Sequence, residues 1–298
     1  METKQSKTPA PAAGKNPAAD IPSARTVPEL RAQVVAWRKA GLTIGFVPTM
    51  GALHEGHLSL VALAKQRCDK VVVSIFVNPK QFAPTEDFDT YPRDEAGDGA
   101  KVTGAGCDLI FAPTPAIMYP PGFVTKVEVT GISEGLCGAV RPHFFGGVAT
   151  VVSKLLLQCL PDVAIFGEKD YQQLQVIKAL TRDLDIPVEI LGGPTVREPD
   201  GLAMSSRNAY LTADERKAAP LLHRTMADVA ATVINGGLVA DALTKGRATI
   251  QAAGFKLDYL ELRDAETLRP VTGIPTRPTR VLVAAWLGKT RLIDNLGV

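Results

Sequence analysis

Residues 48–57, with the sequence PTMGALHEGH, constrain this chain most, because two histidines fall where a strand passes into a helix. The apolar run 44–47 precedes them, and residues 58–64 have the pattern of the first turns of a helix. In α/β sheets, ligands bind at the carboxyl ends of the strands. A helix start adds free N–H groups and a positive dipole end, so this stretch predicts a phosphate-binding turn.

Common alternatives for such a turn can be compared with the sequence. The Gly-x-Gly-x-x-Gly spacing of dinucleotide sites is absent, and no Lys-Ser or Lys-Thr follows Gly51 as in a Walker loop. A zinc-protease helix needs His-Glu-x-x-His, and here His57 comes one residue too early. Two other interpretations stay open: His54 as a metal ligand, and either histidine as an ordinary capping or surface residue.

Apolar runs and helical patterns alternate through residues 25–195. Thr26 and Glu29 form a capping box at the start of a helix that stops at Gly41. Further helices are expected up to about residue 68, near 95–105, and over 146–160 and 171–184. Strands are expected at 43–48, 71–76, 109–111, 163–166 and 188–191, with a half-exposed strand at 123–129. This alternation predicts an α/β fold, a Rossmann-like doubly wound parallel sheet.

The two ends of the chain differ from this pattern. Residues 196–298 predict a smaller C-terminal α+β lid domain, with helices at 212–235 and 239–252, a strand at 257–262, and a hairpin around Gly288. Residues 1–24 are rich in Ala, Pro and Lys and poor in large apolar side chains, so we expect a disordered N-terminal extension.

Composition limits the functional classes. Hydrophobic residues make up 46% and charged residues 21% of the 298 residues, and the net charge of +2 argues against a nucleic-acid partner. The apolar runs are strand-sized, which predicts no membrane span. The four cysteines are scattered without a C-x-x-C pair, as is typical of a reduced, cytoplasmic protein.

Two further strand ends carry polar groups. Residues 167–173 read GEKDYQQ, where Lys169 can contact a phosphate and Gln173 an alcohol or carboxylate. The simpler alternative is a polar turn with Asp170 as N-cap. Residues 78–82 read NPKQF, which would bring Gln81 to the same crevice unless Asn-Pro only sets a turn.

Two more groups of residues suit phosphate or its metal. Residues 94–98 contain three acidic side chains, which can hold Mg²⁺ but favour a solvated helix start at Asp94 and Glu95. Residues 205–207, Ser-Ser-Arg, combine two hydroxyls and a guanidinium at the junction of the two halves. They predict a phosphate clamp on a closing lid, with a flexible linker as the alternative.

The histidine turn is similar to the H-x-G-H signature of the nucleotidyltransferase superfamily, whose second signature lies where Ser-Ser-Arg occurs. Five motifs in order, PTMGALHEGH, SIFVNPKQF, YPR, FGEKDYQQL and DGLAMSSRN, resemble the pantothenate synthetase family from about residue 26 to the C-terminus. The resemblance implies a ligase that condenses pantoate with β-alanine through a pantoyl adenylate, using ATP with its Mg²⁺. It also implies a homodimer.

The same resemblance implies roles for particular residues. His54, His57, Lys169 and Arg207 would be catalytic, with His57 as the family's proton donor. Gln81 would contact pantoate and β-alanine, and Gln173 would contact pantoate. The ATP-binding residues would be Met50, Gly51, Ala52, Leu53, His54, Glu55, Gly56, His57, Gly167, Glu168, Lys169, Asp170, Val196, Met204, Ser205, Ser206 and Arg207.

One departure and two rival functions remain. The family pattern Arg-Pro-x-His-Phe has Phe144 at its histidine position here, with His143 one place early, so that histidine's role is not transferred. The metal ligands are not identified, and Asp98 only matches an acidic family position. The rivals are an adenylyltransferase that stops at a nucleotide product and a non-catalytic nucleotide sensor. The glutamine motifs argue against the first, and the two intact phosphate-binding signatures against the second.

Overall fold

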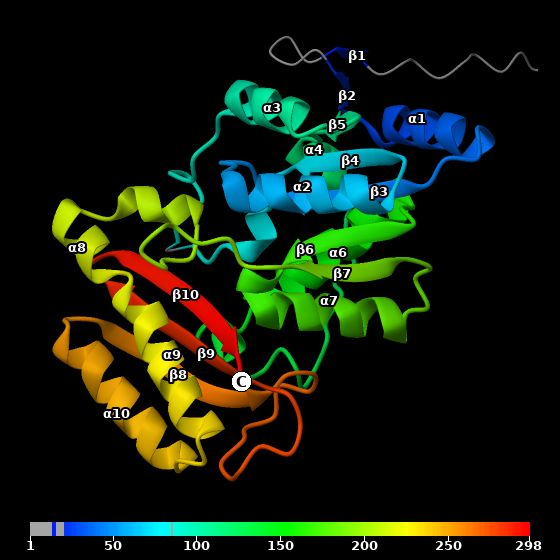
Figure 1. Ribbon diagram of the computed structural model, residues 1–298. Coiled ribbons are helices and arrows are strands. Elements are labelled where there is room, and N and C mark those ends of the chain that lie inside the picture. The colour runs from blue at the N-terminus through cyan, green and yellow to red at the C-terminus, as the bar shows by residue number, and fades with distance from the viewer. Residues whose placement is uncertain (1–13, 16–20, 85) are drawn as a thin grey trace, which may run out of the picture.

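The computed structural model describes residues 14–15, 21–84 and 86–298, and its larger sheet matches the fold predicted from the sequence (Figure 1). Within these residues seven strands pair in the order β1-β2-β5-β4-β3-β6-β7, all parallel except β1 with β2. The strands are β1 (Gly14–Lys15), β2 (Pro22–Ala24), β3 (Ile44–Thr49), β4 (Lys70–Ile75), β5 (Leu109–Phe111), β6 (Val163–Gly167) and β7 (Glu189–Gly193).

Helices cover both faces of this sheet, as a doubly wound fold requires. One apolar core lies between the sheet and α1, α6 and α7, and a second lies between the sheet and α2 and α3. The elements between the strands are α1 (Val27–Lys39), α2 (Glu55–Arg67), η1 (Pro79–Gln81), α3 (Glu95–Gly104), α4 (Pro115–Met118), α5 (Cys137–Val140), α6 (Phe144–Cys159), η2 (Glu168–Asp170) and α7 (Tyr171–Asp183).

The start of α1 shows how local chemistry sets these boundaries. The Thr26 hydroxyl accepts from the Glu29 N–H, and the Glu29 carboxylate accepts from the Thr26 N–H, which confirms the predicted capping box. The helix ends before Gly41, whose φ of 75° is a left-handed conformation that glycine adopts readily.

The C-terminal part forms a second, smaller layer pair that lies against the carboxyl ends of the large sheet (Figure 1). Its antiparallel sheet has the order β10-β9-β8, and its own apolar core joins that sheet to α9 and α10. The elements are η3 (Ser206–Tyr210), α8 (Ala213–Ala218), α9 (Leu221–Ile234), α10 (Val239–Ala252), β8 (Lys256–Asp264), β9 (Thr279–Leu287) and β10 (Thr290–Gly297).

Three expectations need correction. The single helix predicted over 212–235 is broken into α8 and α9 at Pro220, because proline lacks an N–H and clashes with the preceding turn. Residues 123–129 form no strand within the described chain. They contact α6, where the Val127 N–H donates to the Thr150 hydroxyl at 3.0 Å.

The third correction concerns the predicted disordered extension, residues 1–24. Pro22–Ala24 instead form β2, which pairs with β5, and Gly14–Lys15 pair with β2. Ala24 is fully buried. The rest of that expectation, at residues 1–13 and 16–20, lies outside the described residues. Among the residues described, no helix has the length and apolar character needed to cross a membrane.

Candidate active site

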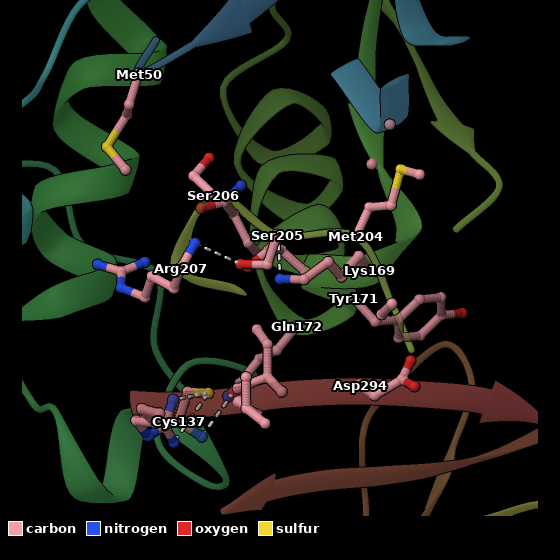
Figure 2. A pocket seen from close by; sticks show the side chains of 18 of the residues that line it. Met50, Cys137, Lys169, Tyr171, Gln172, Met204, Ser205, Ser206, Arg207 and Asp294 are labelled. Carbon is pink, nitrogen blue, oxygen red and sulfur yellow. Dashed lines mark hydrogen bonds and ion pairs between the residues drawn. The ribbon is translucent and has the colours of Figure 1, made fainter. Parts of the chain in front are cut away.

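A cavity of about 770 Å³ lies where the C-terminal part meets the strand ends of the large sheet. The turns after β3, β4 and β6 contribute to its wall, as does the segment that leads into η3. Figure 2 shows Met50, Lys169, Met204, Ser205, Ser206 and Arg207 around this space. The predicted site residues that line it are Met50, His54, Gly56, His57, Gln81, Gly167, Lys169, Asp170, Gln173, Val196, Met204, Ser205, Ser206 and Arg207.

Five residues predicted to bind ATP are absent from the described lining of this cavity. Leu53 packs into the core, Glu55 is exposed, and Glu168 pairs with Arg280 at 3.1 Å. Gly51 and Ala52 have φ angles of 81° and 51°, so they shape the turn that presents the histidines. A contact of these five residues with ATP stays a prediction.

The two histidines cap helix α2 and face the cavity at the same time. The Nδ1 of His54 accepts from the Gly56 N–H at 3.2 Å, and the Nδ1 of His57 accepts from the His54 N–H at 3.3 Å. The capping interpretation left open by the sequence is therefore realised at Nδ1. A neutral ring whose Nδ1 accepts must carry its proton on Nε2, so each ring keeps an Nε2–H donor for a ligand.

Burial keeps both rings neutral at physiological pH. It lowers the pKa of His54 to about 4, with a further contribution from the Lys169 ammonium. Burial also lowers the pKa of His57 to about 3, and His54 adds to this effect. The ring centroids lie only 4.2 Å apart, so protonating both would place two like charges side by side. The pair therefore offers two neutral hydrogen-bond donors.

Asp98 stabilises the backbone of the histidine turn. Its carboxylate accepts from the N–H groups of Ala52 and Leu53 at 2.7 and 2.8 Å, and the residue is 1% exposed. Lys101 stabilises the same turn by donating to the Leu53 carbonyl at 2.8 Å. Asp94 is the N-cap of α3, as the solvated helix-start interpretation predicted. Within the described residues, no group of three or more metal-ligating side chains is formed.

The Lys169 turn follows β6. The Lys169 ammonium lies 3.6 Å from the Asp170 carboxylate, and both residues line the cavity. Asp170 is the N-cap of α7 by position, but no side-chain capping bond is formed in this part of the described chain. The simple N-cap alternative thus does not account for the Asp170 carboxylate, which faces the lysine.

The two glutamines predicted to bind substrate differ in their surroundings. The Oε1 of Gln81 accepts from the Asn78 amide at 2.9 Å, so the amide nitrogen of Gln81 is the group that can serve a ligand. Asn78 is fully buried and accepts in turn from the Tyr119 hydroxyl at 2.7 Å. Gln173 lines the cavity, whereas its neighbour Gln172 holds loop carbonyls at Ile132 and Gly135.

The Ser-Ser-Arg segment is anchored to the N-terminal half. The Ser206 hydroxyl donates to the Ala52 carbonyl at 2.8 Å, and Arg207 forms a two-pronged pair with Asp87 at 3.0 and 3.2 Å. A second such pair joins Arg141 to Glu86 at 2.6 and 2.7 Å, with the Arg141 guanidinium 3.9 Å from the Phe144 ring.

These arginine partners are residues that the sequence reading missed. Glu86 and Asp87 line the cavity and are consecutive acidic residues between the NPKQF and YPR motifs, a signal that was present but not weighed. Phe144, at the family's histidine position, packs on Arg141 instead of offering an imidazole. The structure gives no further account of that departure.

A parallel α/β sheet whose strand ends carry a helix-capping turn, a lysine turn and a hydroxyl–guanidinium segment around one cavity is an arrangement typical of enzymes that bind nucleotides. Comparison with known proteins sharpens this class. The family model described as pantoate-beta-alanine ligase matches residues 23–297. The chain belongs to that ligase family, and the sequence-based prediction of the family is confirmed.

Individual relatives agree closely. A pantothenate synthetase of Rhodospirillum rubrum is 59% identical over 93% of this chain and 99% of its own length. One of Caulobacter vibrioides is 60% identical over 92% of this chain and 97% of its own. The solved structure of pantothenate synthetase from Thermus thermophilus has a TM-score of 0.86 and 48% identity, covering 92% of this chain and 98% of that one.

A second solved structure includes ligands. The pantoate-beta-alanine ligase of Francisella tularensis, described as complexed with beta-gamma ATP and beta-alanine, has a TM-score of 0.77 and 35% identity. The match covers 93% of this chain and 97% of that one. This chain is therefore similar over nearly its whole length to ligases of one family.

Proposed function

We propose that this chain condenses pantoate with β-alanine at the expense of ATP, through a pantoyl-adenylate intermediate. One observation carries the proposal: two neutral imidazoles, Lys169 and the Ser-Ser-Arg segment line the same cavity as Gln81 and Gln173. Phosphate-directed donors and small-molecule donors thus face one space. That arrangement supports transfer of the adenylyl group onto a small acid rather than release of a nucleotide product.

In the first step a carboxylate oxygen of pantoate attacks the α-phosphorus of ATP, and pyrophosphate leaves. The transition state spreads negative charge over phosphoryl oxygens, so the protein's contribution is positioning and charge stabilisation. His54 and His57 donate from Nε2 without carrying charge. Lys169 and Arg207 supply the positive charge through their ammonium and guanidinium groups.

In the second step the amine of β-alanine attacks the acyl carbon of the adenylate. The amide bond forms, the amine proton is released, and AMP leaves with an oxygen that came from pantoate. The Gln81 amide nitrogen would donate to pantoate and β-alanine, and Gln173 to pantoate, which is supported by the Asn78–Gln81 bond and by the position of both glutamines in the cavity wall. A cavity closed by the C-terminal part would protect the adenylate from water.

The Ser-Ser-Arg segment lies between the two parts of the chain. Arg207 donates to Asp87 through Nε and Nη2, so its Nη1 group can still donate to phosphoryl oxygens. We therefore propose that residues 196–298 act as a lid over the domain formed by residues 25–195. Mg²⁺ enters with ATP as part of the substrate.

Assembly and location complete the proposal. We propose a homodimer, as the family resemblance implies, and sedimentation analysis would test it. A cytoplasmic location is supported by the four cysteines, which are all buried and free of disulfides. The Francisella tularensis relative described with an ATP analogue and beta-alanine supports the substrate assignment.

A product assay tests the reaction against its rivals. The purified chain is incubated with ATP, Mg²⁺, pantoate and β-alanine, and nucleotides and acids are separated by chromatography. We expect pantothenate and AMP in equal amounts. A nucleotide conjugate as the final product would favour an adenylyltransferase, and binding of ATP without turnover would favour a sensor. Either result would overturn the proposal.

A further inference from the structure

We infer that Asn295, on the last strand of the C-terminal part, is a positioning residue for Lys169. The inference rests on the proposed function, in which Lys169 contacts the phosphates of ATP. Asn295 is 3% exposed, and its side-chain amide nitrogen donates to two successive carbonyls, those of Glu168 and Lys169, each at 2.9 Å. These residues are more than a hundred positions apart in the sequence.

The two carbonyls belong to the peptide planes on either side of the Lys169 α-carbon. Holding both planes restricts φ and ψ of Lys169, and so fixes the direction in which its side chain leaves the backbone. Side-chain caps do not do this from within the turn, because neither Gly167 nor Asp170 makes one in the described structure. Asn295, from the C-terminal part, therefore provides the side-chain hydrogen bonds that fix the backbone of this turn.

The orientation of the Asn295 amide is itself fixed. Arg280, on β9, donates to the Asn295 side-chain oxygen, which leaves the amide nitrogen for the turn. The same guanidinium donates to the Glu168 carboxylate at 3.1 Å and lies 3.9 Å from the Tyr171 ring. Arg280 and Asn295 thus both contact the Lys169 turn, and Arg280 also packs on Tyr171, the first residue of α7.

Asp294, which precedes Asn295 on β10, connects this strand to the segment between the two sheets. Asp294 forms a two-pronged pair with Arg197 at 2.6 and 2.9 Å, and Arg197 lies in the segment between the two sheets. Figure 2 shows Lys169 and Tyr171 above the strand that carries Asp294. The position of Lys169 therefore depends on docking of the C-terminal sheet, which couples the phosphate site to the lid.

A double-mutant cycle tests this coupling. Asn295→Ala and Asn295→Asp are each made in the full chain and in Lys169→Ala, and pantoate-dependent exchange of labelled pyrophosphate into ATP is measured. Asn295→Asp keeps the size of the side chain and its oxygen for Arg280 but replaces the donor with a second acceptor. The folded fraction of each variant is measured by circular dichroism, so that kcat refers to folded protein. We expect kcat of the exchange to fall about tenfold to hundredfold in either variant.

In the Lys169→Ala background the same changes should cost no further activity, because their effect passes through the lysine. Ile250→Ala, in the buried core of the C-terminal part, is the control for lost stability, and it should leave kcat of the folded fraction unchanged. Additive losses, or wild-type exchange by both Asn295 variants, would overturn the inference alone. Near-normal exchange by Lys169→Ala would instead overturn the proposed function.

Discussion

The histidine turn and the Lys169 turn, both proposed to contact phosphate, are stabilised in different ways. The histidine turn at residues 51–57 is held mainly by the N-terminal part, through mutual capping of His54 and His57 and through Asp98, and receives one further bond from Ser206 to the Ala52 carbonyl. The Lys169 turn is held from the other domain, by Asn295 and Arg280. Most bonds of the histidine turn therefore form when the N-terminal part folds, whereas the bonds to the Lys169 turn form only when the two parts meet.

The difference separates the roles that each turn can play. A preorganised pair of neutral donors can bind phosphate before closure, because their geometry and protonation are already fixed. The backbone of Lys169 is held by a residue of the C-terminal part, so the direction of its side chain depends on whether the two parts are in contact. We infer that the histidine turn provides constant transition-state stabilisation, whereas the lysine turn responds to the position of the lid.

Removing the central donor should have the largest effect. His57→Ala is expected to lower the rate of adenylate formation on the order of a hundredfold or more, because a donor aimed at developing charge is lost. Single-turnover kinetics with ATP and pantoate measures this rate. Gln66→Ala, an exposed change in the same helix, is the matched control. Adenylation close to the wild-type rate would remove His57 from the chemistry.

The support behind the histidine turn gives the next largest effect. Asp98→Ala removes the acceptor of one buried and one partly buried N–H group, which should cost on the order of 3 kcal/mol of unfolding free energy. Calorimetry measures the loss of stability. In double-mutant cycles on adenylation, the effect should be non-additive with His57→Ala and additive with Lys169→Ala. The reverse pattern would mean that the two turns are not held independently.

The histidine turn should make the free energy of unfolding depend on pH, because His57 is neutral in the folded protein. The pKa of His57 is about 3 when folded and near 6.5 when unfolded, so the unfolded chain takes up a proton first as pH falls. The contribution of the neutral ring is complete above about pH 6.5 and is progressively lost toward pH 3. By pH 5 the loss should be about 2 kcal/mol. Urea unfolding of wild type and His57→Gln at several pH values measures it, and parallel curves would contradict it.

The smallest effect concerns strand β2, which is separated from β3 by two strands, so its loss should leave both turns unaffected. Deleting residues 1–24 removes β2, including the buried Ala24 whose carbonyl accepts from the Ala112 N–H at 3.0 Å. We expect a fall of a few degrees in Tm, with turnover per folded molecule unchanged. Deleting only residues 1–13 should change neither quantity. A loss of turnover in the shorter deletion would contradict this separation.

Features that depend on residues close together in the sequence were predicted better than features that depend on distant residues. The capping box at Thr26 and the histidine turn were found because short-range spacing determines them. The break at Pro220 was missed although its signal was present, since proline rarely continues a helix. The strand expected at 123–129 failed because alternation predicts an extended chain but cannot supply a neighbouring strand.

Contacts between distant residues were beyond the sequence. Asp98 appeared only as an acidic residue near a triphosphate, because nothing in its surroundings indicates that Ala52 and Leu53 lie against it. Asn295 gave no signal at all, since its partners belong to a turn in the other domain. Sequence reasoning therefore identified the groups that face the ligand better than the groups that hold them.

We propose that both turns act at the α-phosphorus of ATP, so that an adenylate is made before β-alanine is used. A two-stage labelling experiment follows labelled pyrophosphate into ATP with pantoate present and β-alanine absent, and then carboxylate ¹⁸O of pantoate into AMP once β-alanine is added. We expect exchange in the first stage and ¹⁸O in AMP in the second. Release of ADP and phosphate, with no label in AMP, would contradict it.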